Sequence, residues 1–381
     1  MRIVININTS WNIYNFRKGL LRFLIAQGHE IYAVAPEDNY SPRLEALGCR
    51  YIPVKLDNKG VNPLKDLKYF YHLYQIYASI RPQVVLHYTI KPNIYGTLAA
   101  KLLGIPVINN VSGLGTAFLR KDLGAKIARL LYRLAFRFPA KVFFQNSQDK
   151  ALFVEQNLVA EARTALLPGS GICLESFRPQ PQPSAKGFVF LLIARLIYDK
   201  GIREYVEAIR LLRKQGIEAR FQLLGAFEKD PRNKLNIAPE QVAEWQREGL
   251  IEYLGSTEQV QPFIAQAHCI VLPSYREGTP RVLLEAASMA RPLVASDVPG
   301  CREVLMHEEN GFLCEVQNAQ SLADAMLRMY SVSEEERLQM GLRGREKMEK
   351  EFDEQLVIAL YAAAIESLSK NTAQERLAKI S

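Results

Sequence analysis

Short apolar runs alternate with helical periods along the whole chain, and this alternation limits its possible folds more than any other feature. In the first half, runs such as RIVININ and QVVLHY are followed by helix-like segments such as FRKGLLRFLIAQGH. The same order resumes after residue 187, where FVFLLIA precedes REYVEAIRLLRKQG. Repeated strand–helix units build parallel sheets with helices on both faces. The sequence therefore predicts an α/β protein of doubly wound, Rossmann-like sheets.

Residues 178–187, RPQPQPSAKG, separate the two series of strands and helices. Three prolines within five residues neither continue a helix nor fit inside a central strand, so this stretch is predicted to be a linker. The length of 381 residues suffices for two domains. We expect an N-terminal Rossmann-like domain over 1–180 and a C-terminal one over 181–381, with the last helices packing back on the first domain. Ligands of such sheets bind outside the carboxyl ends of the strands.

Charge and composition narrow the class of protein. The net charge is +8, and residues 1–180 carry 23 Lys and Arg against 11 Asp and Glu, which gives +12 for that half. A basic first half favours an anionic partner, either nucleic acid or an anionic membrane surface. No apolar stretch reaches the roughly 18 to 20 residues of a membrane span, and no secretory leader is evident. Five scattered cysteines argue against a disulfide framework or a zinc site. We therefore expect a cytoplasmic protein.

The segment EGTPRVLLE, residues 277–285, places two acids around the start of a predicted helix. Thr279 is a good N-cap and Pro280 a good first helical residue, so the helix is predicted to begin at a strand's carboxyl end. Its unpaired backbone N–H groups then form an anion site suited to phosphate. Glu277 precedes the helix, and Glu285 lies on the same face as Arg281.

Carboxylates repel phosphate, but they accept hydrogen bonds from paired hydroxyl groups. A phosphate site flanked by acids therefore fits a nucleotide-sugar, with one acid for the ribose and the other for the sugar. The alternative for Glu285 is a helix-surface acid paired with Arg281 or Arg302. The spacing alone decides nothing, because Glu240 and Glu248 are also eight residues apart.

Cations that would neutralise the diphosphate occur at the end of the first strand after the linker. The segment IARLIYDKG supplies Arg195 and Lys200, and Gly225 at the next strand end allows close backbone approach. The alternative for Lys200 is a solvated side chain.

These segments, with SYREGTPRVLLEAASMARPLVASDVPGCREV and LPGSGICLESFRP, resemble glycosyltransferase family 4. The resemblance covers nearly the whole chain and is strongest over residues 188–316. It implies the two-domain GT-B fold and a retaining, metal-independent enzyme without a cofactor. The first half, with NTSWNIYNFRKGL and YTIKPNIYGTLAAKLLGIPVINNVSGLG, is similar to bacterial members that build lipid-linked glycans.

The resemblance also implies roles for individual residues. Glu277 would contact the donor sugar hydroxyls and Glu285 the ribose, while Arg195 and Lys200 would bind the diphosphate. Gly278, Thr279 and Pro280 would form the loop whose backbone faces the phosphates. On this basis the predicted catalytic residues are Arg195, Lys200 and Glu277, and the predicted donor-binding residues are Gly225, Gly278, Thr279, Pro280 and Glu285.

The first half departs from the family pattern at two places. Many members have a Gly-Gly loop after the first strand, where this chain has Thr9, Ser10, Trp11 and Asn12. Many also have a histidine near the reacting sugar, where this chain has Asn110 or Ser112, and His87 lies one strand earlier. The alternative for His87 is a packed histidine. The predicted acceptor-side residues are Ser10, Asn12, His87, Lys91, Asn110 and Ser112.

Residues 120–141 form a basic amphipathic segment. Its apolar stripe comprises Leu123, Ile127, Leu130, Leu131, Leu134 and Phe138, beside a basic stripe of Lys126, Arg129, Arg133 and Arg137. Such a helix suits an anionic membrane surface, and the alternative is a core-facing helix with a solvated basic side. No nucleic-acid-binding motif accompanies it, so nucleic acid is not an expected partner.

The sequence therefore predicts a peripheral enzyme on the inner face of the cell membrane. We expect transfer of a hexose or N-acetylhexosamine from a nucleotide-sugar, UDP-linked, to a polyprenyl-diphosphate-linked glycan in surface polysaccharide or glycoprotein glycan assembly. Three alternatives share the donor cleft: a GT-B nucleotide-sugar epimerase, a glycosyltransferase with a soluble acceptor, and a binder without turnover. Conversion of a nucleotide-sugar without acceptor would favour the epimerase.

Overall fold

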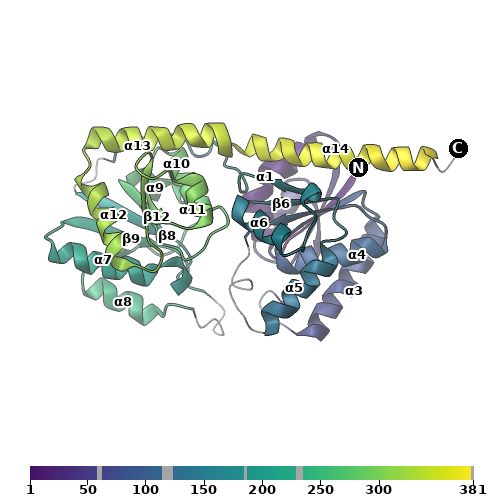
Figure 1. The fold of residues 1–381 in the computed structure, drawn as a ribbon, viewed down its shortest axis with the longest axis horizontal. Coiled ribbons are helices and arrows are strands. Elements are labelled where there is room, and N and C mark those ends of the chain that lie inside the picture. The colour runs from purple at the N-terminus through teal and green to yellow at the C-terminus, as the bar shows by residue number, and fades with distance from the viewer. Residues whose placement is uncertain (58–61, 114–122, 184–186, 229–234, 379–381) are drawn as a thin grey trace. The chain divides into compact units, whose positions relative to one another are not determined.

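The computed structural model describes residues 1–57, 62–113, 123–183, 187–228 and 235–378. The chain forms two compact units, one of residues 1–170 together with 354–381 and the other of residues 171–353. We call them the first and second unit (Figure 1). Each contains one parallel sheet covered by helices, as the sequence predicts.

The first unit is built on a seven-stranded parallel sheet in the order β3-β2-β1-β4-β5-β6-β7. Its strands are β1 Arg2–Asn6, β2 Glu30–Ala35, β3 Arg50–Pro53, β4 Val84–Tyr88, β5 Val107–Val111, β6 Lys141–Phe144 and β7 Thr164–Leu166. Its helices are α1 Ser10–Ala26, α2 Ser41–Ala46, α3 Pro63–Ile80, η1 Pro92–Gly96, α4 Thr97–Leu102, α5 Leu123–Ala135, α6 Ser147–Glu155, η2 Glu161–Arg163 and α14 Glu354–Ala378.

Local sequence sets the start of these helices. The Thr9 side chain accepts a hydrogen bond from the backbone N–H of Asn12 and caps α1. Asn62 caps α3 in the same way, and Pro63 occupies its first position. The chain order then fixes the layers: β1 to β3 advance in one direction and β4 to β7 in the other. Right-handed crossovers therefore place α3, α4, α5 and α6 on one face of the sheet and α1 with α2 on the opposite face.

The second unit has a six-stranded parallel sheet in the order β10-β9-β8-β11-β12-β13. Its strands are β8 Phe188–Ile193, β9 Ala219–Leu224, β10 Glu252–Tyr253, β11 Cys269–Leu272, β12 Leu293–Ser296 and β13 Gly311–Cys314. Its helices are η3 Tyr198–Lys200, α7 Ile202–Lys214, α8 Pro239–Arg247, α9 Gln261–Gln266, α10 Arg281–Ser288, α11 Pro299–Val304, α12 Ala319–Ser331, α13 Glu334–Lys347 and η4 Met348–Phe352.

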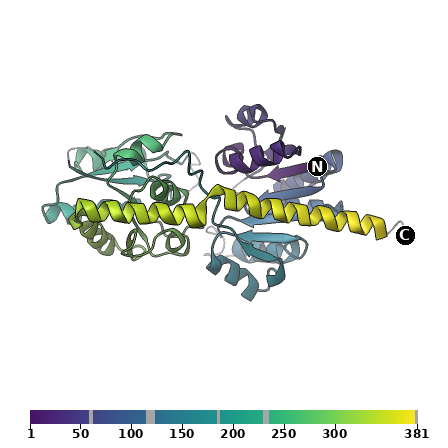
Figure 2. The same ribbon diagram turned by 90° about the horizontal axis from the view of Figure 1, so that it is seen from above.

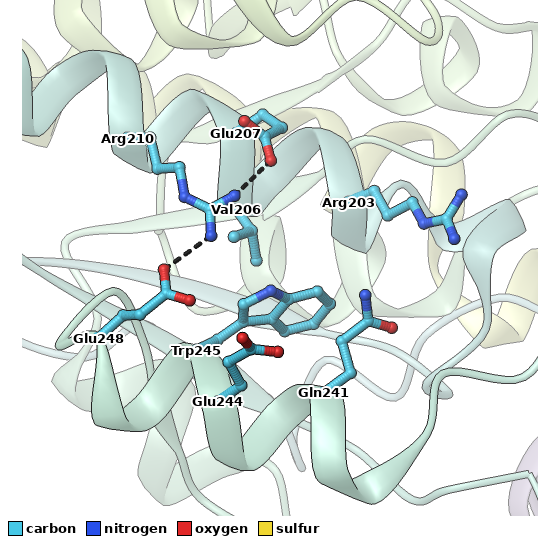
Figure 3. Close-up of a pocket in the computed structure, with 8 residues that line it drawn as sticks. All are labelled: Arg203, Val206, Glu207, Arg210, Gln241, Glu244, Trp245 and Glu248. Atoms are coloured by element: carbon cyan, nitrogen blue, oxygen red, sulfur yellow. Dashed lines mark hydrogen bonds and ion pairs between the residues drawn. The ribbon is translucent and has the colours of Figure 1, made fainter.

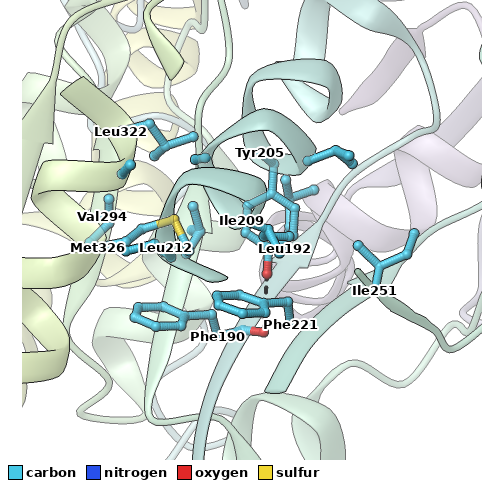
Figure 4. Packing of buried hydrophobic residues seen from close by; sticks show 14 of the residues in the cluster. Phe190, Leu192, Tyr205, Ile209, Leu212, Phe221, Ile251, Val294, Leu322 and Met326 are labelled. Carbon is cyan, nitrogen blue, oxygen red and sulfur yellow. Dashed lines mark hydrogen bonds between the residues drawn. The ribbon is translucent and has the colours of Figure 1, made fainter. Parts of the chain in front are cut away.

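The centre of the second sheet is packed on both faces, which explains its continuous apolar runs. Between the sheet and α7, the rings of Phe190 and Phe221 stack with centroids 5.6 Å apart, and the Tyr205 hydroxyl donates to the Phe190 carbonyl at 3.2 Å (Figure 4). This hydrogen bond satisfies a phenol that is wholly buried. The core therefore holds β8, whose carboxyl end carries candidate site residues, in a fixed position.

The division of the chain differs from the predicted boundary at residue 180. Ile172 and Phe177 are buried in the core of the second unit, and the Arg291 guanidinium donates to the carbonyls of Gln180 at 3.0 Å and Pro181 at 2.6 Å. These contacts attach residues 171–181 to the second unit. The last helix, α14, runs along the first unit (Figure 2). Its residues Val357 and Ile358 are part of the core of that unit. In the described part of the chain, no helix is both long and apolar enough to span a membrane.

Candidate donor site at the carboxyl edge of the second sheet

The candidate donor residues follow two neighbouring central strands of the second sheet. Arg195 and Lys200 follow β8, and Glu277 follows β11. β8 pairs with β9 on one side and with β11 on the other, so the chain reverses its direction of winding between β8 and β11. This topological switch point is where doubly wound sheets bind ligands.

The loops after β8 and β11 are tied together by their backbones. The Tyr275 N–H donates to the Asp199 carbonyl at 2.9 Å. Gly201 adopts a φ of 69°, and a Cβ at this position would overlap the Pro273 carbonyl oxygen. Only glycine therefore allows the turn at Lys200 to approach the end of β11 this closely.

Lys200 and Glu277 form an ion pair across these two loops. The exposed fractions of their side chains are 21% and 13%, so the pair is mostly shielded from water. The interaction is therefore screened less by salt than a surface pair. The ion pair holds the Lys200 ammonium at the switch point. An ammonium has three N–H donors, so it can also donate to a ligand there.

Cys301 lies near this ion pair and is fully buried. Burial raises the pKa of its thiol well above the ordinary value, and the charge of Glu277 raises it further. The thiol therefore stays protonated near neutral pH and is not an activated nucleophile.

Arg195 is held apart from the Lys200–Glu277 pair. Its Nη1 atom lies 3.3 Å from Glu228 Oε2, and 63% of its side chain is exposed. The structure therefore places both predicted cations at the end of β8, but it brings only Lys200 into contact with a predicted acid. The exposed guanidinium keeps the conformational freedom to turn toward a bound anion.

Glu285 contacts Arg281, as the i, i+4 spacing on α10 predicts. Arg281 Nε lies 3.0 Å from Glu285 Oε1, and the exposed fraction of the Glu285 side chain is 13%. Burial raises the pKa of Glu285, and the charge of Arg281 lowers it by less. Glu285 thus pairs with Arg281, as its alternative interpretation predicts, but its carboxylate is shielded from water and is not on the helix surface. Its contact with the donor stays a prediction.

The start of α10 differs by one residue from the prediction. Pro280 has a ψ of 115° and is the N-cap, so Arg281 is the first helical residue and Thr279 lies before the cap. The extended Pro280 cannot belong to the helix, but its carbonyl accepts from the Leu283 N–H at 3.0 Å. The side chain of Pro280 itself makes no capping hydrogen bond.

Two glycines bring the neighbouring loops onto this site. A Cβ at Gly225 would overlap the Ala194 carbonyl, and a Cβ at Gly300 would overlap the Gly278 carbonyl. Gly225 was predicted from its place at a strand end. Gly300 was missed, although its position after β12 in the segment DVPG carries the same signal.

A groove lies between α7 and α8 of the second unit (Figure 3). Its volume is about 310 Å³, and Arg210 bridges Glu207 and Glu248 across it at 2.5 and 2.7 Å. None of the predicted donor residues lines it. Arg210 and Glu207 both lie on α7, so we interpret the Arg210–Glu248 pair as the contact that ties α7 to the end of α8.

The predicted acceptor-side residues lie in the first unit, and His87 is fully buried there. Its exposed fraction is 0%, and its two ring nitrogens lie 3.0 Å from the Tyr77 hydroxyl and 3.1 Å from Asn109 Oδ1. Burial lowers the pKa of His87 to about 3. His87 is therefore a neutral, packed histidine, as its alternative interpretation has it, and its ring is closed off from solvent.

Asn110 and Ser112 are linked to the C-terminal helix of the same unit. The Asn110 amide donates to the Tyr361 hydroxyl at 2.9 Å, and its Oδ1 accepts from the Ser112 hydroxyl at 2.8 Å. Asn110 is buried, whereas Ser112 is half-buried at the carboxyl end of β5. Tyr361 was missed, because no spacing in the sequence relates residues so far apart.

The remaining acceptor-side residues lie at the start of α1 and directly before η1. Lys91 forms an ion pair of 2.5 Å with Asp66 of α3. Ser10 is buried, and its hydroxyl donates to the Pro36 carbonyl at 3.0 Å. Asn12 is half-buried in the first turn of α1. These contacts do not bring Ser10 and Asn12 together with Lys91.

Comparison with known proteins identifies the class. Residues 187–331 match the family model of glycosyl transferases group 1, and residues 3–146 match the glycosyl transferase 4-like model. The two matched segments fall in the second and first units respectively. The chain is a glycosyltransferase with the two-domain GT-B fold, and it belongs to the glycosyltransferases that these models describe.

The chain is also similar to two individual glycosyltransferases. The chain is 27% identical to N,N'-diacetylbacillosaminyl-diphospho-undecaprenol alpha-1,3-N-acetylgalactosaminyltransferase of Campylobacter jejuni, covering 97% of this chain and all of that protein. It is 24% identical to UDP-Gal:alpha-D-GlcNAc-diphosphoundecaprenol alpha-1,3-galactosyltransferase of Escherichia coli, covering 71% of this chain and 72% of that one.

Solved structures share the fold. A glycosyltransferase from Rickettsia africae superposes with a TM-score of 0.78 at 16% identity, covering 97% of this chain and 99% of that one. Alr3699/HepE of Anabaena, solved in complex with UDP, also gives 0.78 at 17% identity, covering 96% and 100%. At these identities the superpositions establish the fold alone.

Proposed function

We propose that this glycosyltransferase moves a hexose or N-acetylhexosamine, with retention of configuration, from a UDP-sugar to a polyprenyl-diphosphate-linked glycan. The observation that carries the donor side is the shielded Lys200–Glu277 pair at the topological switch point. The acceptor class is supported by the two relatives named above, both of which act on undecaprenol-diphosphate glycans.

The proposed reaction exchanges one glycosidic bond for another. The bond between the sugar C1 and the diphosphate oxygen breaks, and the diphosphate leaves with the electron pair. The acceptor hydroxyl oxygen bonds to C1 from the same face and transfers its proton to the departing phosphate. Lys200 and Arg195 stabilise the negative charge that develops on the leaving oxygen, which is the main catalytic contribution of the protein.

The acids orient the donor instead of attacking it. When the diphosphate binds Lys200, the ammonium exchanges part of its contact with Glu277 for the phosphate oxygens. Glu277 can then accept hydrogen bonds from the sugar hydroxyls. Glu285 keeps Arg281 on one oxygen and offers the other to the ribose. The backbone of Gly278, Thr279 and Pro280 is proposed to face the phosphates, and Gly225 leaves room for the nucleotide.

We further propose that transfer needs no metal ion or other cofactor, because Lys200 and Arg195 provide permanent positive charge at the diphosphate. Among the described residues, no group of three His, Cys, Asp or Glu side chains is arranged to hold a metal ion.

Attachment to the inner face of the cell membrane through α5 is part of the proposal. Ile127, Leu130 and Leu134 expose 50%, 57% and 45% of their surface, while Tyr132 and Phe136 on the other side are buried. Leu131 of the predicted stripe is half-buried and packs on the core, whereas the exposed members fit insertion between lipid headgroups. Lys126, Arg133 and Arg137 are exposed beside it and suit anionic lipids. Arg120 and Lys121 lie outside the described residues.

The test is a panel of UDP-, GDP- and dTDP-sugars incubated with the enzyme and bacterial lipid extract, followed by mass spectrometry of the lipid fraction. We expect one UDP-sugar to add a single sugar mass to a diphosphate-linked glycan, with the same yield in excess EDTA. Product only on soluble sugars would refute the lipid acceptor. Interconversion of the UDP-sugar without acceptor would identify an epimerase, and loss of activity in EDTA would refute metal independence.

A further inference from the structure

Helix α3 carries a second exposed apolar stripe, in addition to that of α5. Leu64, Leu67 and Tyr71 expose 71%, 62% and 58% of their surface. Their spacing of three and four residues places them on one side of the helix. Tyr69, Leu73 and Tyr77 on the other side are buried against the sheet. The inner side of α3 is therefore well packed, and loose packing of the helix does not explain the exposed stripe.

The stripes of α3 and α5 belong to one layer of the first unit. α3 packs against η1 and α4, and α5 packs against η1. At the far end of α4, Leu102 exposes 67% of its surface, and the Lys101 ammonium lies 5.2 Å from the centre of the exposed Phe138 ring. α3, α4 and α5 thus present their outer sides on the same face of the sheet, as the right-handed crossovers require.

Exposed apolar side chains are concentrated on this layer. Among the described residues, 15 large hydrophobic side chains are exposed, and eight of them lie on α3, α4 and α5 or directly after α5: Leu64, Leu67, Tyr71, Leu102, Ile127, Leu130, Leu134 and Phe138. Large apolar patches on a protein surface mark interaction sites. Lys65 and Lys68 border the α3 stripe as Lys126 borders that of α5. The partner is therefore expected to combine an apolar interior with negative charge.

We propose that α3, the end of α4 and α5 form one bilayer-binding surface for anionic phospholipids, with α3 as its second insertion element. The proposal rests on the proposed function, because a polyprenyl-linked acceptor is held in a bilayer. The two helices start at the carboxyl edge of the first sheet, since each follows a strand. Asp66, in the first turn of α3, binds Lys91. The surface therefore borders the edge where the acceptor-side residues Lys91 and Ser112 lie.

The test is flotation of the full-length protein with vesicles of phosphatidylglycerol and phosphatidylethanolamine, compared with vesicles of phosphatidylcholine alone. Three double variants are compared: Leu67→Ser/Tyr71→Ser on α3, Leu130→Ser/Leu134→Ser on α5, and Leu356→Ser/Leu360→Ser on α14 as the matched control. The control residues expose 41% and 39% of their surface but lie outside the proposed surface. Thermal unfolding verifies that each variant is folded, and Leu64→Gln serves as a milder second α3 variant.

We expect the wild type to bind the anionic vesicles and to release them as the salt concentration rises. The α3 and α5 variants should each lower the partition coefficient about tenfold, with the control within about twofold of wild type. Binding of the α3 variant at wild-type strength would overturn the proposal. So would a wild-type oligomer that the α3 variant converts to monomer without any change in vesicle binding, because the stripe would then be a protein interface.

The outcome is separable from that of the proposed function. Vesicle binding is measured without donor or acceptor, so it does not depend on transfer. A wild-type enzyme that binds anionic vesicles but glycosylates only soluble sugars would support the surface and refute the acceptor class. Transfer to a short-chain, water-soluble acceptor diphosphate should be unchanged in the α3 variant.

Discussion

Lys200 and Glu277 form a shielded ion pair, and the proposed donor complex adds a second partner for the lysine. Removing charges from water is costly, so a shielded lysine requires a partner. In the free enzyme that partner is Glu277. In the proposed donor complex, the diphosphate becomes a second partner, and the positive charge stays where the leaving oxygen develops its charge. Preorganised charge of this kind needs no rearrangement during the reaction.

Replacing Lys200 by alanine should lower kcat/KM about 100- to 1000-fold, because the charge that stabilises the leaving diphosphate is lost. Steady-state kinetics with the identified donor measures the effect, and chemical denaturation verifies folding. Lys350→Ala is the matched control, since Lys350 pairs with Glu346 on the exposed side of η4. A Lys200→Ala enzyme that is folded and works at the wild-type rate would refute the leaving-group role.

The ionised Glu285 carboxylate is expected to lower the stability of the fold and to strengthen donor binding. Because its folded pKa is raised, the folded state binds more protons than the unfolded state above the ordinary pKa near 4.5. The contribution of Glu285 to stability therefore falls as pH rises through that window. We expect Glu285→Gln to gain unfolding free energy relative to wild type between pH 4 and pH 7, measured by urea denaturation.

The same Glu285→Gln variant should bind the donor worse. Loss of a charged hydrogen bond to the ribose predicts a KM for the nucleotide-sugar about 10- to 100-fold higher. Tighter donor binding together with unchanged stability would contradict both parts of the argument and leave Glu285 as the plain partner of Arg281.

His87 should affect the pH dependence of stability but not that of catalysis. Its folded pKa of about 3 lies below its ordinary value of 6.5, so the unfolded state binds the additional proton between these values. Stability is therefore lost as pH falls below 6.5, by about 2 kcal/mol at pH 5 from this residue. His87→Gln should reduce the difference in unfolding free energy between pH 7 and pH 5 by that amount. An unchanged difference would show that His87 is not the buried neutral group described above.

At the scale of elements, α14 completes the core of the first unit. Its residues Val357, Ile358, Tyr361 and Ile365 are part of the core of the first unit, although they follow the second unit in the sequence. The Tyr361 hydroxyl accepts from Asn110, whose other amide atom holds Ser112. Helix α14 thus helps to orient Asn110, one of the predicted acceptor-side residues.

Tyr361→Phe should lower the free energy of unfolding by about 1–3 kcal/mol, because the buried Asn110 amide loses the acceptor of its hydrogen bond. Thermal and urea denaturation measure the change. Tyr71→Phe is the control, since its phenol is exposed and should alter stability by less than about 0.5 kcal/mol. Equal stabilities of the two variants would show that the Asn110–Tyr361 bond contributes nothing.

Helix starts were predicted where the capping chemistry is local. Thr9 and Asn62 cap α1 and α3 through their own side chains. At α10 the same reasoning placed the start one residue early, at Pro280. A proline is equally suited to the first helical position and to the extended residue before it. The local sequence therefore does not settle which of the two positions Pro280 occupies.

At the scale of the whole molecule, the sequence predicts two sheets in the observed order, but it does not predict which unit every segment packs on. The boundary predicted from the proline-rich stretch fell after residue 180, yet residues 171–181 belong to the second unit. Proline marks where regular structure stops, but it carries no information on which core the irregular chain packs against. The buried Arg291 guanidinium donates to the carbonyls of Gln180 and Pro181, and these hydrogen bonds attach the segment to the second unit.

A chain that ends at Asp353 should lose the first unit selectively. Without α14, the apolar surface that Val357, Tyr361 and Ile365 cover would face water. Limited proteolysis should then digest residues 1–170 while a fragment containing residues 171–353 persists. Resistance of both units to protease would show that α14 is dispensable to the first core.

The alternation of apolar runs and helices determined the sheets, because the periods of strands and helices are local properties of the chain. Local composition also determined that Arg195, Lys200, Glu277 and Gly225 lie at strand ends of one sheet edge. Only the tertiary structure decided that Lys200 pairs with Glu277, that His87 is sealed, that Tyr361 reaches Asn110, and that the α3 stripe faces outward. These outcomes depend on contacts between residues far apart in sequence, whose energies no local pattern encodes.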